Sequence, residues 1–445
     1  MNAAKRNKKK TPKQAADRLS LHWPELILLL GTALAATAWG WSEGKAVLTP
    51  WPRLAGGVVG LTSAALLLGR RLPPSEQRLG LGLLAAGAIL SQLGAIGSQY
   101  LLFFGVAGGT AAMFWPEEYA FLLLLPLAAW AAPVLGGGPA LVALVSGITM
   151  VVLAKRARRG RDLMLAGLGT GLAGGVAAAA IASQAGPVGV GAAFLAGPAS
   201  ALLIWATLPP VERWVDRTSP LSLVELLNPA HPLLERLRNE APGTYYHSRD
   251  VAALAEAAAR AVRADPLLAA VGGLYHDIGK LLRPHFFAEN QNGTNPHDEL
   301  APSMSKVVLA SHVKEGVELG RRYGLRADVL KFVATHHGTT VMRYFSNQGA
   351  AQGLSEDEFR YDAPLPDTKE TAIVMLADSV EAYARGAERD DLAELVERVI
   401  EERRRDGQLD RSPLTLGDLA RIKRAFLEVL QGMAHRRAAD YPPLG

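Results

Sequence analysis

The sequence GLYHDIGKLL, residues 272–281, places two ionisable side chains, His276 and Asp277, next to each other in an apolar run. The neighbours Leu274 and Ile278 indicate that this run is buried. Buried polar groups cost free energy unless they are hydrogen-bonded, paired with an opposite charge or bound to a metal ion. The pair therefore predicts partners elsewhere in the chain.

Histidines supply most of the candidate partners, because nine of the ten in the chain follow residue 230. The informative ones lie on predicted helices or at their ends, together with one aspartate in an apolar stretch. The ordered set is His247, His276, Asp277, His312, His336, His337 and Asp378. Nitrogen and oxygen ligands without cysteine suit iron, manganese or another first-row divalent ion rather than a thiolate zinc site.

This set is too large for one ion and predicts two divalent metal ions that share a carboxylate. A metal pair about 3.5–4 Å apart clamps the attacking and leaving oxygens of a phosphoryl displacement. It also lowers the pKa of a bridging water, which supplies hydroxide at neutral pH. The alternative interpretation is that the histidines are ordinary hydrogen-bonded core residues and that Asp378 is paired with an arginine.

Helical periodicity dominates the sequence after Gly243, so helices must position these side chains. The segments predicted to be helical are 248–264 (beginning at a Ser248 cap), 266–282, 305–324, 327–337, 368–385, 392–407 and 415–437. Two long stretches between them, 283–303 and 337–367, are predicted to be non-helical, and the first is expected to form part of a substrate pocket. No strand series, P-loop or dinucleotide fingerprint is present, which predicts an all-helical domain.

The composition differs between the two halves of the chain. Between His22 and Leu208, short charged clusters separate long runs of Ala, Leu, Gly and Val, whereas charged residues are frequent after Pro209. A helix needs roughly 17–25 apolar residues to cross a bilayer. Predicted spans are 25–42, 54–70, 79–97, 100–115, 119–135, 139–154, 163–183 and 187–208. The fourth and fifth are nearly continuous, so length alone allows seven or eight spans.

Basic residues favour eight spans, because Lys and Arg stay on the cytoplasmic side. Eight crossings place the basic N-terminal run, the arginines at 70, 71 and 78 and the cluster 155–161 inside, together with the soluble half. We therefore expect a multi-pass protein of the inner (cytoplasmic) membrane with its catalytic domain in the cytoplasm. The first span is either a retained anchor or a cleaved signal. Spans three to eight have no ionisable residue in their interiors, which argues against coupled transport.

These features predict an all-α protein in which a polytopic helical membrane domain precedes an all-helical cytosolic domain. The expected divisions are a basic cytosolic N-terminus (1–21), a transmembrane domain (22–208), a juxtamembrane connector (209–240), a metal-dependent phosphohydrolase domain (241–435) and a C-terminal tail (436–445). The absence of cysteine excludes disulfides and Cys-based zinc sites. The net charge of +5 comes largely from basic runs that flank apolar segments, so no nucleic acid polymer is expected as a partner.

Motifs within residues 220–385 resemble the HD-domain metal-dependent phosphohydrolases, and more closely the 7TM-HD membrane phosphodiesterases that hydrolyse cyclic di-AMP, the PgpH type. They read NPAHPLLERL, EAPGTYYHS, GLYHDIGKLLRPHFFAENQ, NPHDELAPSMS, SHVKEGVELG, HHGTTVMRYF and TKETAIVMLADSVEA. The resemblance implies one iron or manganese ion held by His247, His276, Asp277 and Asp378. It implies a second held by Asp277, His312, His336 and His337, so that Asp277 bridges the two ions.

The resemblance also implies a reaction, the hydrolysis of cyclic di-AMP to linear pApA by a metal-bridging hydroxide. Asp277 and Lys280 would be catalytic, and Lys280 is expected to project from the same helix face as His276 and contact phosphate. Further candidates for holding phosphate or base are Arg283, Asn290, Asn295, His297, Arg343 and Tyr344. The expected partners are a cyclic dinucleotide and the lipid bilayer, and a homodimer stays open.

Two departures from the family pattern bear on function. Members usually carry a large extracellular domain between the first and second spans, where this chain has only about ten residues, SEGKAVLTPW. The related HD-GYP proteins, which cleave cyclic di-GMP, carry a Gly-Tyr-Pro signature that HHGTTVMRYF lacks. Two alternatives remain: turnover of another cyclic dinucleotide or nucleotide, or a membrane receptor that binds a nucleotide without turnover.

Overall fold

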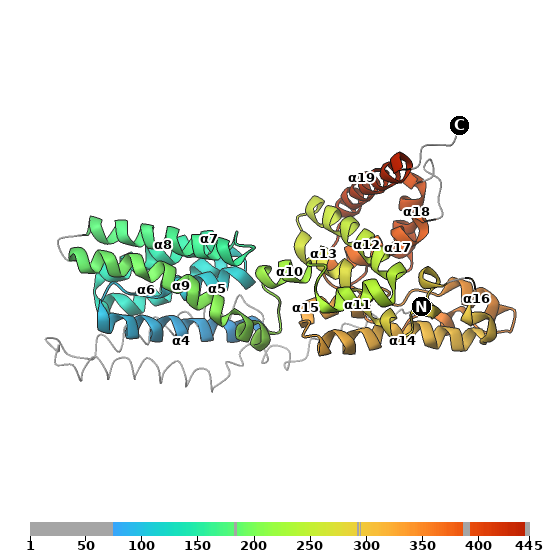
Figure 1. Cartoon of the computed structure of the whole chain (residues 1–445), viewed down its shortest axis with the longest axis horizontal. Helices are drawn as coiled ribbons and strands as arrows, with labels where there is room; N and C mark the ends of the chain where they lie inside the picture. Colours follow the sequence, from blue (N-terminus) through green and yellow to red (C-terminus); the bar gives the residue numbers. More distant parts are fainter. Residues whose placement is uncertain (1–73, 182–184, 292, 294, 386–391, 441–445) are drawn as a thin grey trace, which may run out of the picture. The chain divides into compact units, whose positions relative to one another are not determined.

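The computed structural model describes residues 74–181, 185–291, 293, 295–385 and 392–440 (Figure 1). The predicted N-terminus 1–21 and the first two predicted spans, 25–42 and 54–70, lie outside the described residues. The chain divides into two compact units, and the division falls between residues 215 and 222. Every regular element among the described residues is a helix, apart from one isolated bridge, so the prediction of an all-α fold is confirmed.

The first unit is a bundle of apolar helices. It contains α4 (Pro74–Gly97), α5 (Phe104–Phe114), α6 (Glu117–Leu135), α7 (Gly137–Ala154), α8 (Gly160–Ala180) and α9 (Gly186–Val215). Four helices in the described part of the chain are long and apolar enough to cross a membrane: α4 from Glu76 onward, α7, α8 and α9. Each of the predicted spans three to eight overlaps one of the six helices.

Helix α5 differs from the uninterrupted span predicted at 100–115. It has 11 residues, and all of them are buried. At 1.5 Å per residue it is about 16 Å long, roughly half of a bilayer's hydrocarbon core. The residues before it are irregular, and the backbone N–H of Phe103 donates to Ser91 Oγ at 2.9 Å. Irregular backbone within a membrane needs partners from the protein or from water, and Ser91 provides one for the N–H of Phe103.

Helices α8 and α9 approach through glycines. A Cβ atom on Gly197 would lie 2.2 Å from the backbone N of Gly171 and 2.4 Å from the carbonyl O of Gly167. Small residues at such positions let two membrane helices touch through their backbones. Helix α9 also continues through Pro209 and Pro210 to Val215, so the predicted connector begins as a helix.

The second unit contains the remaining elements. Its α-helices are α10 (Pro220–Leu226), α11 (Pro232–Glu240), α12 (Pro242–Ala261), α13 (Pro266–Tyr275), α14 (Pro302–Arg322), α15 (Ala327–Thr335), α16 (Arg343–Ala350), α17 (Lys369–Ala384), α18 (Leu392–Arg405) and α19 (Leu416–Asp440). Its short 3₁₀ helices are η2 (Ile278–Leu282), η3 (Pro284–Phe286), η4 (Ala288–Asn290), η5 (Pro296–Glu299) and η6 (Glu356–Phe359). Helices α10 to α14 all begin at a proline, whose fixed φ and missing N–H suit the first helical position.

Two local predictions were wrong. The helix predicted to begin at Ser248 begins at Pro242, so Ser248 is buried within α12 and His247 lies on the helix rather than before it. The proline at the first helical position explains the earlier start.

The stretch 337–367, predicted to be non-helical, contains α16, whose Phe345 packs with Phe359 in a small apolar cluster.

Helix α17 forms the centre of the second unit. It packs against α12, α13 and α18 (Figure 1). The six residues Ala372–Ala377 have no exposed surface. Helices α12 and α13 approach closely, because a Cβ atom on Gly273 would lie 2.6 Å from the Cα of Ala252. This packing fixes the C-terminal end of α13, where the His-Asp pair lies.

Candidate metal centre

His276 and Asp277 lie at a junction between two kinds of helix. Helix α13 ends at Tyr275, His276 caps it, and Asp277 has φ −105° and ψ 14° before η2 begins. The pair was predicted to lie within one rigid helix, and that was wrong. The 3₁₀ turn packs directly on α14 through Gly279.

The structure brings all seven candidate ligands together. Atoms of Asp277, His312, His336 and His337 lie within 4.8 Å of one another, and so do atoms of His247, His276 and Asp277. Only Asp277 belongs to both groups.

Asp378 joins the same cluster from α17. Its Oδ1 lies 3.0 Å from His247 Nε2 and 3.7 Å from His276 Nε2, and its Oδ2 lies 3.9 Å from His337 Nδ1. Both of its carboxylate oxygens therefore face imidazole nitrogens.

Backbone carbonyls set the tautomers of three of the histidines. His276 Nδ1 donates to the Gly273 carbonyl at 2.8 Å and His312 Nδ1 to the Leu309 carbonyl at 2.5 Å. His336 Nδ1 donates to the Val333 carbonyl at 3.0 Å. A carbonyl only accepts hydrogen bonds, so the proton of each neutral ring is on Nδ1 and Nε2 carries a lone pair. The Nε2 atoms of all three rings lie 3.3–3.4 Å from oxygens of Asp277.

The inward-facing atoms fit a cation. His312 Nε2 lies 3.3 Å from His336 Nε2, and burial lowers the pKa of His312 to about 4 despite the attraction of Asp277, so this ring is neutral at pH 7. His276 Nε2 and Asp277 Oδ1 are buried without a hydrogen-bond partner among the described residues. Lone pairs that face one another in a buried site repel unless a cation lies between them. The cluster therefore has the donor set of a divalent metal site.

Asp277 is ionised in this site. Burial alone would raise its pKa, but the charge of Lys280 outweighs burial and holds the pKa well below its usual range. The pKa of Asp378 is likewise held well below its usual range, because a hydrogen bond from His247 outweighs burial. Two carboxylates that stay ionised while buried provide the negative charge that divalent ions require.

Glu381 is a functional candidate that the sequence reasoning missed. It accepts a hydrogen bond from His247 Nδ1 and is itself held by Arg385 at 2.9 and 3.0 Å. It follows Asp378 by three residues on α17, so the two carboxylates lie on the same face of that helix. A carboxylate that holds the outer nitrogen of a ligand histidine orients the ring and increases its basicity.

We expect Glu381→Ala to weaken metal binding by about 10- to 100-fold, the usual effect of losing such a partner. Titration of the metal-free protein with Mn²⁺ measures this change. Glu318→Ala, at an exposed position of α14, is the matched control and should bind Mn²⁺ as the wild type does. Equal Mn²⁺ affinity in the two variants would show that Glu381 does not orient His247.

Lys280 lies deep in the site. Its Nζ is 2.7 Å from Asp277 Oδ2 and 2.8 Å from Glu289 Oε1, and Glu289 also accepts from the Thr244 hydroxyl at 2.9 Å. The expectation that Lys280 shares an α-helical face with His276 was wrong, because a 3₁₀ turn of about three residues aligns it with Asp277 instead. Glu289 is a second residue that the sequence reasoning missed.

Four of the predicted substrate contacts have protein partners in the structure. Arg283 donates to Glu315 at 2.7 Å, and the Asn290 amide donates to Thr244 Oγ1 at 2.8 Å. The Asn295 side chain accepts from the backbone N–H of His297, whose Nε2 donates to the Phe286 carbonyl. Their contact with phosphate or base stays a prediction.

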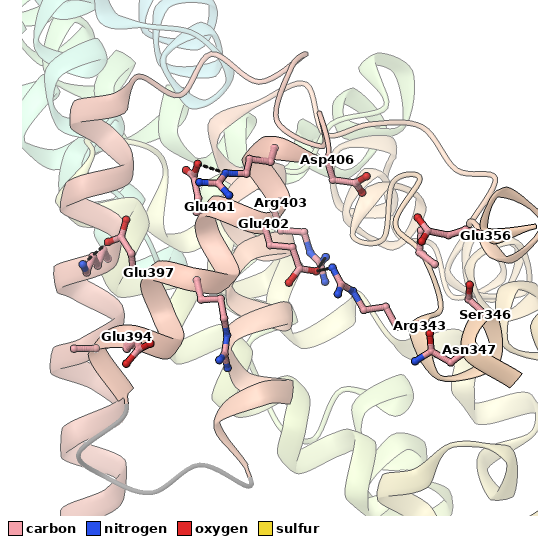
Figure 2. Close-up of a pocket in the computed structure, with 15 residues that line it drawn as sticks. Arg343, Ser346, Asn347, Glu356, Glu394, Glu397, Glu401, Glu402, Arg403 and Asp406 are labelled. Carbon is pink, nitrogen blue, oxygen red and sulfur yellow. Dashed lines mark hydrogen bonds and ion pairs between the residues drawn. The ribbon is translucent and has the colours of Figure 1, made fainter. Parts of the chain in front are cut away.

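Arg343 and Tyr344 lie on α16. Arg343 pairs with Glu402 at 2.8 Å. It lines a pocket of about 1000 Å³ together with residues of η6, α18 and α19 and with Asp406, which follows α18 (Figure 2). None of the seven candidate ligands lines this pocket. Tyr344 is 60% exposed. Substrate binding by Arg343 and Tyr344 stays a prediction.

Comparison with known proteins places the site in a family. Residues 244–383 match the family model of the HD domain. The cyclic-di-AMP phosphodiesterase PgpH of Bacillus subtilis (strain 168) is 41% identical over 254 residues, which are 56% of this chain and 36% of that protein. The PgpH protein of Listeria monocytogenes serotype 1/2a (strain 10403S) is 35% identical over 344 residues, 73% of this chain and 48% of that protein.

A solved structure covers the second unit. The crystal structure of the L. monocytogenes PgpH HD domain in complex with cyclic-di-AMP is 40% identical, with a TM-score of 0.45. The match covers 46% of this chain and 99% of that one. The chain belongs to the PgpH-type HD-domain family.

The family membership agrees with the resemblance seen in the sequence. All seven candidate ligands fall within the HD-domain match, as do Lys280, Glu289 and Glu381. The chain spans less than half the length of the two PgpH proteins. The chain is a membrane protein with a C-terminal HD domain.

Proposed function

We propose that this chain is a membrane-anchored, metal-dependent phosphodiesterase that hydrolyses cyclic di-AMP to linear pApA. The observation that carries the proposal is the buried cluster in which Asp277 belongs to both groups of candidate ligands. Two PgpH relatives named as cyclic-di-AMP phosphodiesterases support the choice of substrate.

We propose that one ion is held by His247, His276, Asp277 and Asp378, and the other by Asp277 with His312, His336 and His337. The donor set of imidazoles and carboxylates favours iron or manganese. Two divalent ions held there would lower the pKa of a shared water and offset the charge of the phosphoryl oxygens. Asp277 would be the ligand common to both ions.

Lys280 contributes a fixed positive charge. Because its ammonium is buried between Asp277 and Glu289, it needs no reorganisation to attract an anionic phosphoryl oxygen. We expect Lys280→Ala to lower kcat by about 100-fold while bound metal is retained, since preorganised charges and donors typically contribute this much. Turnover of cyclic di-AMP, with metal content measured on the same sample, tests this. Unchanged turnover would show that Lys280 pairs with the two carboxylates and does not act on the phosphoryl oxygen.

The location of the site follows from the proposed membrane topology. We propose an inner-membrane protein whose residues 22–208 span the bilayer and whose HD domain, 241–435, lies in the cytoplasm. The connector is 209–240, the tail is 436–445, and a homodimer is compatible with this arrangement. Basic residues at 155–161 support the orientation, because they fall between α7 and α8 at the same side as the end of α9.

The proposed function is tested with the full chain in lipid nanodiscs, loaded with Mn²⁺. Cyclic di-AMP and cyclic di-GMP are supplied separately, and the products are identified by mass spectrometry. Formation of pApA, with slower turnover of the guanine dinucleotide, is the expected result. Preference for cyclic di-GMP would overturn the substrate, and tight binding without turnover would make the chain a nucleotide receptor.

A further inference from the structure

Tyr361 is held in place beside the metal centre by a short antiparallel pairing. Its backbone N–H donates to the Thr340 carbonyl at 3.0 Å, and the Met342 N–H donates to the Phe359 carbonyl at 3.0 Å. An isolated bridge joins Val341 to Arg360 between these two bonds. Because Thr340 follows the proposed ligand His337 by three residues, the pairing fixes Tyr361 to the segment that carries that ligand.

The Tyr361 ring covers one side of the candidate metal centre. It stacks on the His337 ring, with centroids 4.2 Å apart and an interplanar angle of 24°. It meets the His312 ring edge-on, with centroids 6.4 Å apart. The phenol therefore borders two residues of one group of candidate ligands.

No residue in the described ranges accepts a hydrogen bond from the Tyr361 hydroxyl, and the hydrogen bond of this residue is made by its backbone N–H. The charges of Lys280, Asp277 and Asp378 act on the phenol. A tyrosine hydroxyl is protonated at neutral pH and offers one donor. A polar group in a partly buried site usually finds a partner, so an anionic or neutral acceptor from the substrate is the natural one.

We propose that the Tyr361 hydroxyl donates a hydrogen bond to a non-bridging oxygen of the scissile phosphate. This inference rests on the proposed phosphodiesterase function. No proton leaves the tyrosine: the bond strengthens as negative charge builds on the phosphoryl oxygen and weakens after the leaving oxygen departs. Tyr361 would thus act from the side of His337, whereas Lys280 lies beside Asp277 and Glu289.

The test compares the wild-type full chain with Tyr361→Phe, which removes the hydroxyl and keeps the stacked ring. Both are loaded with Mn²⁺ and assayed on cyclic di-AMP and on bis(p-nitrophenyl) phosphate, a diester without a nucleobase. We expect kcat to fall by about 100-fold on both diesters, the usual loss for one preorganised donor, with bound Mn²⁺ unchanged. Tyr383→Phe, 41% exposed on α17, is the matched control and should keep wild-type rates.

Other results would overturn the inference. Rates within twofold of the wild type would show that the hydroxyl contacts no reacting oxygen. A raised KM for cyclic di-AMP alone would assign Tyr361 to the base or ribose, and loss of Mn²⁺ would assign it to holding His337. If the wild type cleaves only bis(p-nitrophenyl) phosphate, cyclic di-AMP is not the substrate. The rates of the wild type and Tyr361→Phe on that diester then still test the role of the hydroxyl. Cleavage of neither diester would overturn both.

Discussion

Asp277→Ala is expected to remove most of the bound metal and all measurable phosphodiesterase turnover together. Asp277 is the one residue common to both groups of candidate ligands, and its oxygens lie 3.3–3.4 Å from three imidazole nitrogens. Losing it would leave each proposed ion one ligand short and leave the buried Lys280 with Glu289 alone. We expect kcat to fall more than about 1000-fold, as when one member of a catalytic unit is removed.

Metal analysis and turnover on the same purified sample check this prediction. Asp277→Asn should have an intermediate metal content, lower than that of the wild type and higher than that of the alanine variant. The amide keeps the shape of the side chain but loses its charge. Asp410→Ala, at an exposed position, should match the wild type in both measurements. Full metal content in Asp277→Ala would rule out a shared carboxylate.

The helices of the second unit could be predicted because their sequence patterns are local. Apolar residues at helical spacing identified α14, α15, α17, α18 and α19 within a few residues, and they identified the start of α13 but not its end. The start of α12 was missed because a serine resembling a cap, Ser248, outweighed the proline six residues earlier, Pro242. A proline at the first helical position was the stronger indication at all of the neighbouring helices.

The residues that support the site could not be identified in the same way. Glu381 and Glu289 are ordinary acidic residues in the sequence, and their roles come from contacts with His247 and Lys280 across the fold. Tyr361 stands 24 residues after His337 and reaches it only through the pairing of 359–361 with 340–342. Long-range contacts of this kind leave no periodic pattern in the sequence.

The change of helix type after Tyr275 has a similar origin. The sequence pattern continues through 266–282 as one apolar helix, but η2 must pass close to α14. A Cβ atom on Gly279 would lie 1.9 Å from the His312 carbonyl oxygen and 2.8 Å from the Gly316 backbone N. The missing side chain at Gly279 lets the two backbones touch, which brings Asp277 and His312 within 3.4 Å.

We therefore expect Gly279→Ala to destabilise the HD domain and to disturb the metal centre. The added methyl group meets backbone atoms of α14, which cannot rotate away as a side chain can, so α14 must shift and carry His312 with it. Overpacking of this kind costs about 3 kcal/mol in the free energy of unfolding. Thermal unfolding of the metal-free chain measures the loss of stability, and Mn²⁺ titration measures the effect on the site.

Gly432→Ala provides the matched control, because a Cβ atom there meets nothing within 4 Å and the residue lies in the interior of α19. Alanine is favoured over glycine inside a helix by about 0.5–1 kcal/mol, so this variant should be as stable as the wild type or slightly more stable. Gly279→Ala should then show both a lower melting temperature and weaker Mn²⁺ binding. A variant that unfolds and binds Mn²⁺ as the wild type does would mean that η2 and α14 are further apart than their backbones indicate, and the position of His312 beside Asp277 would need another cause.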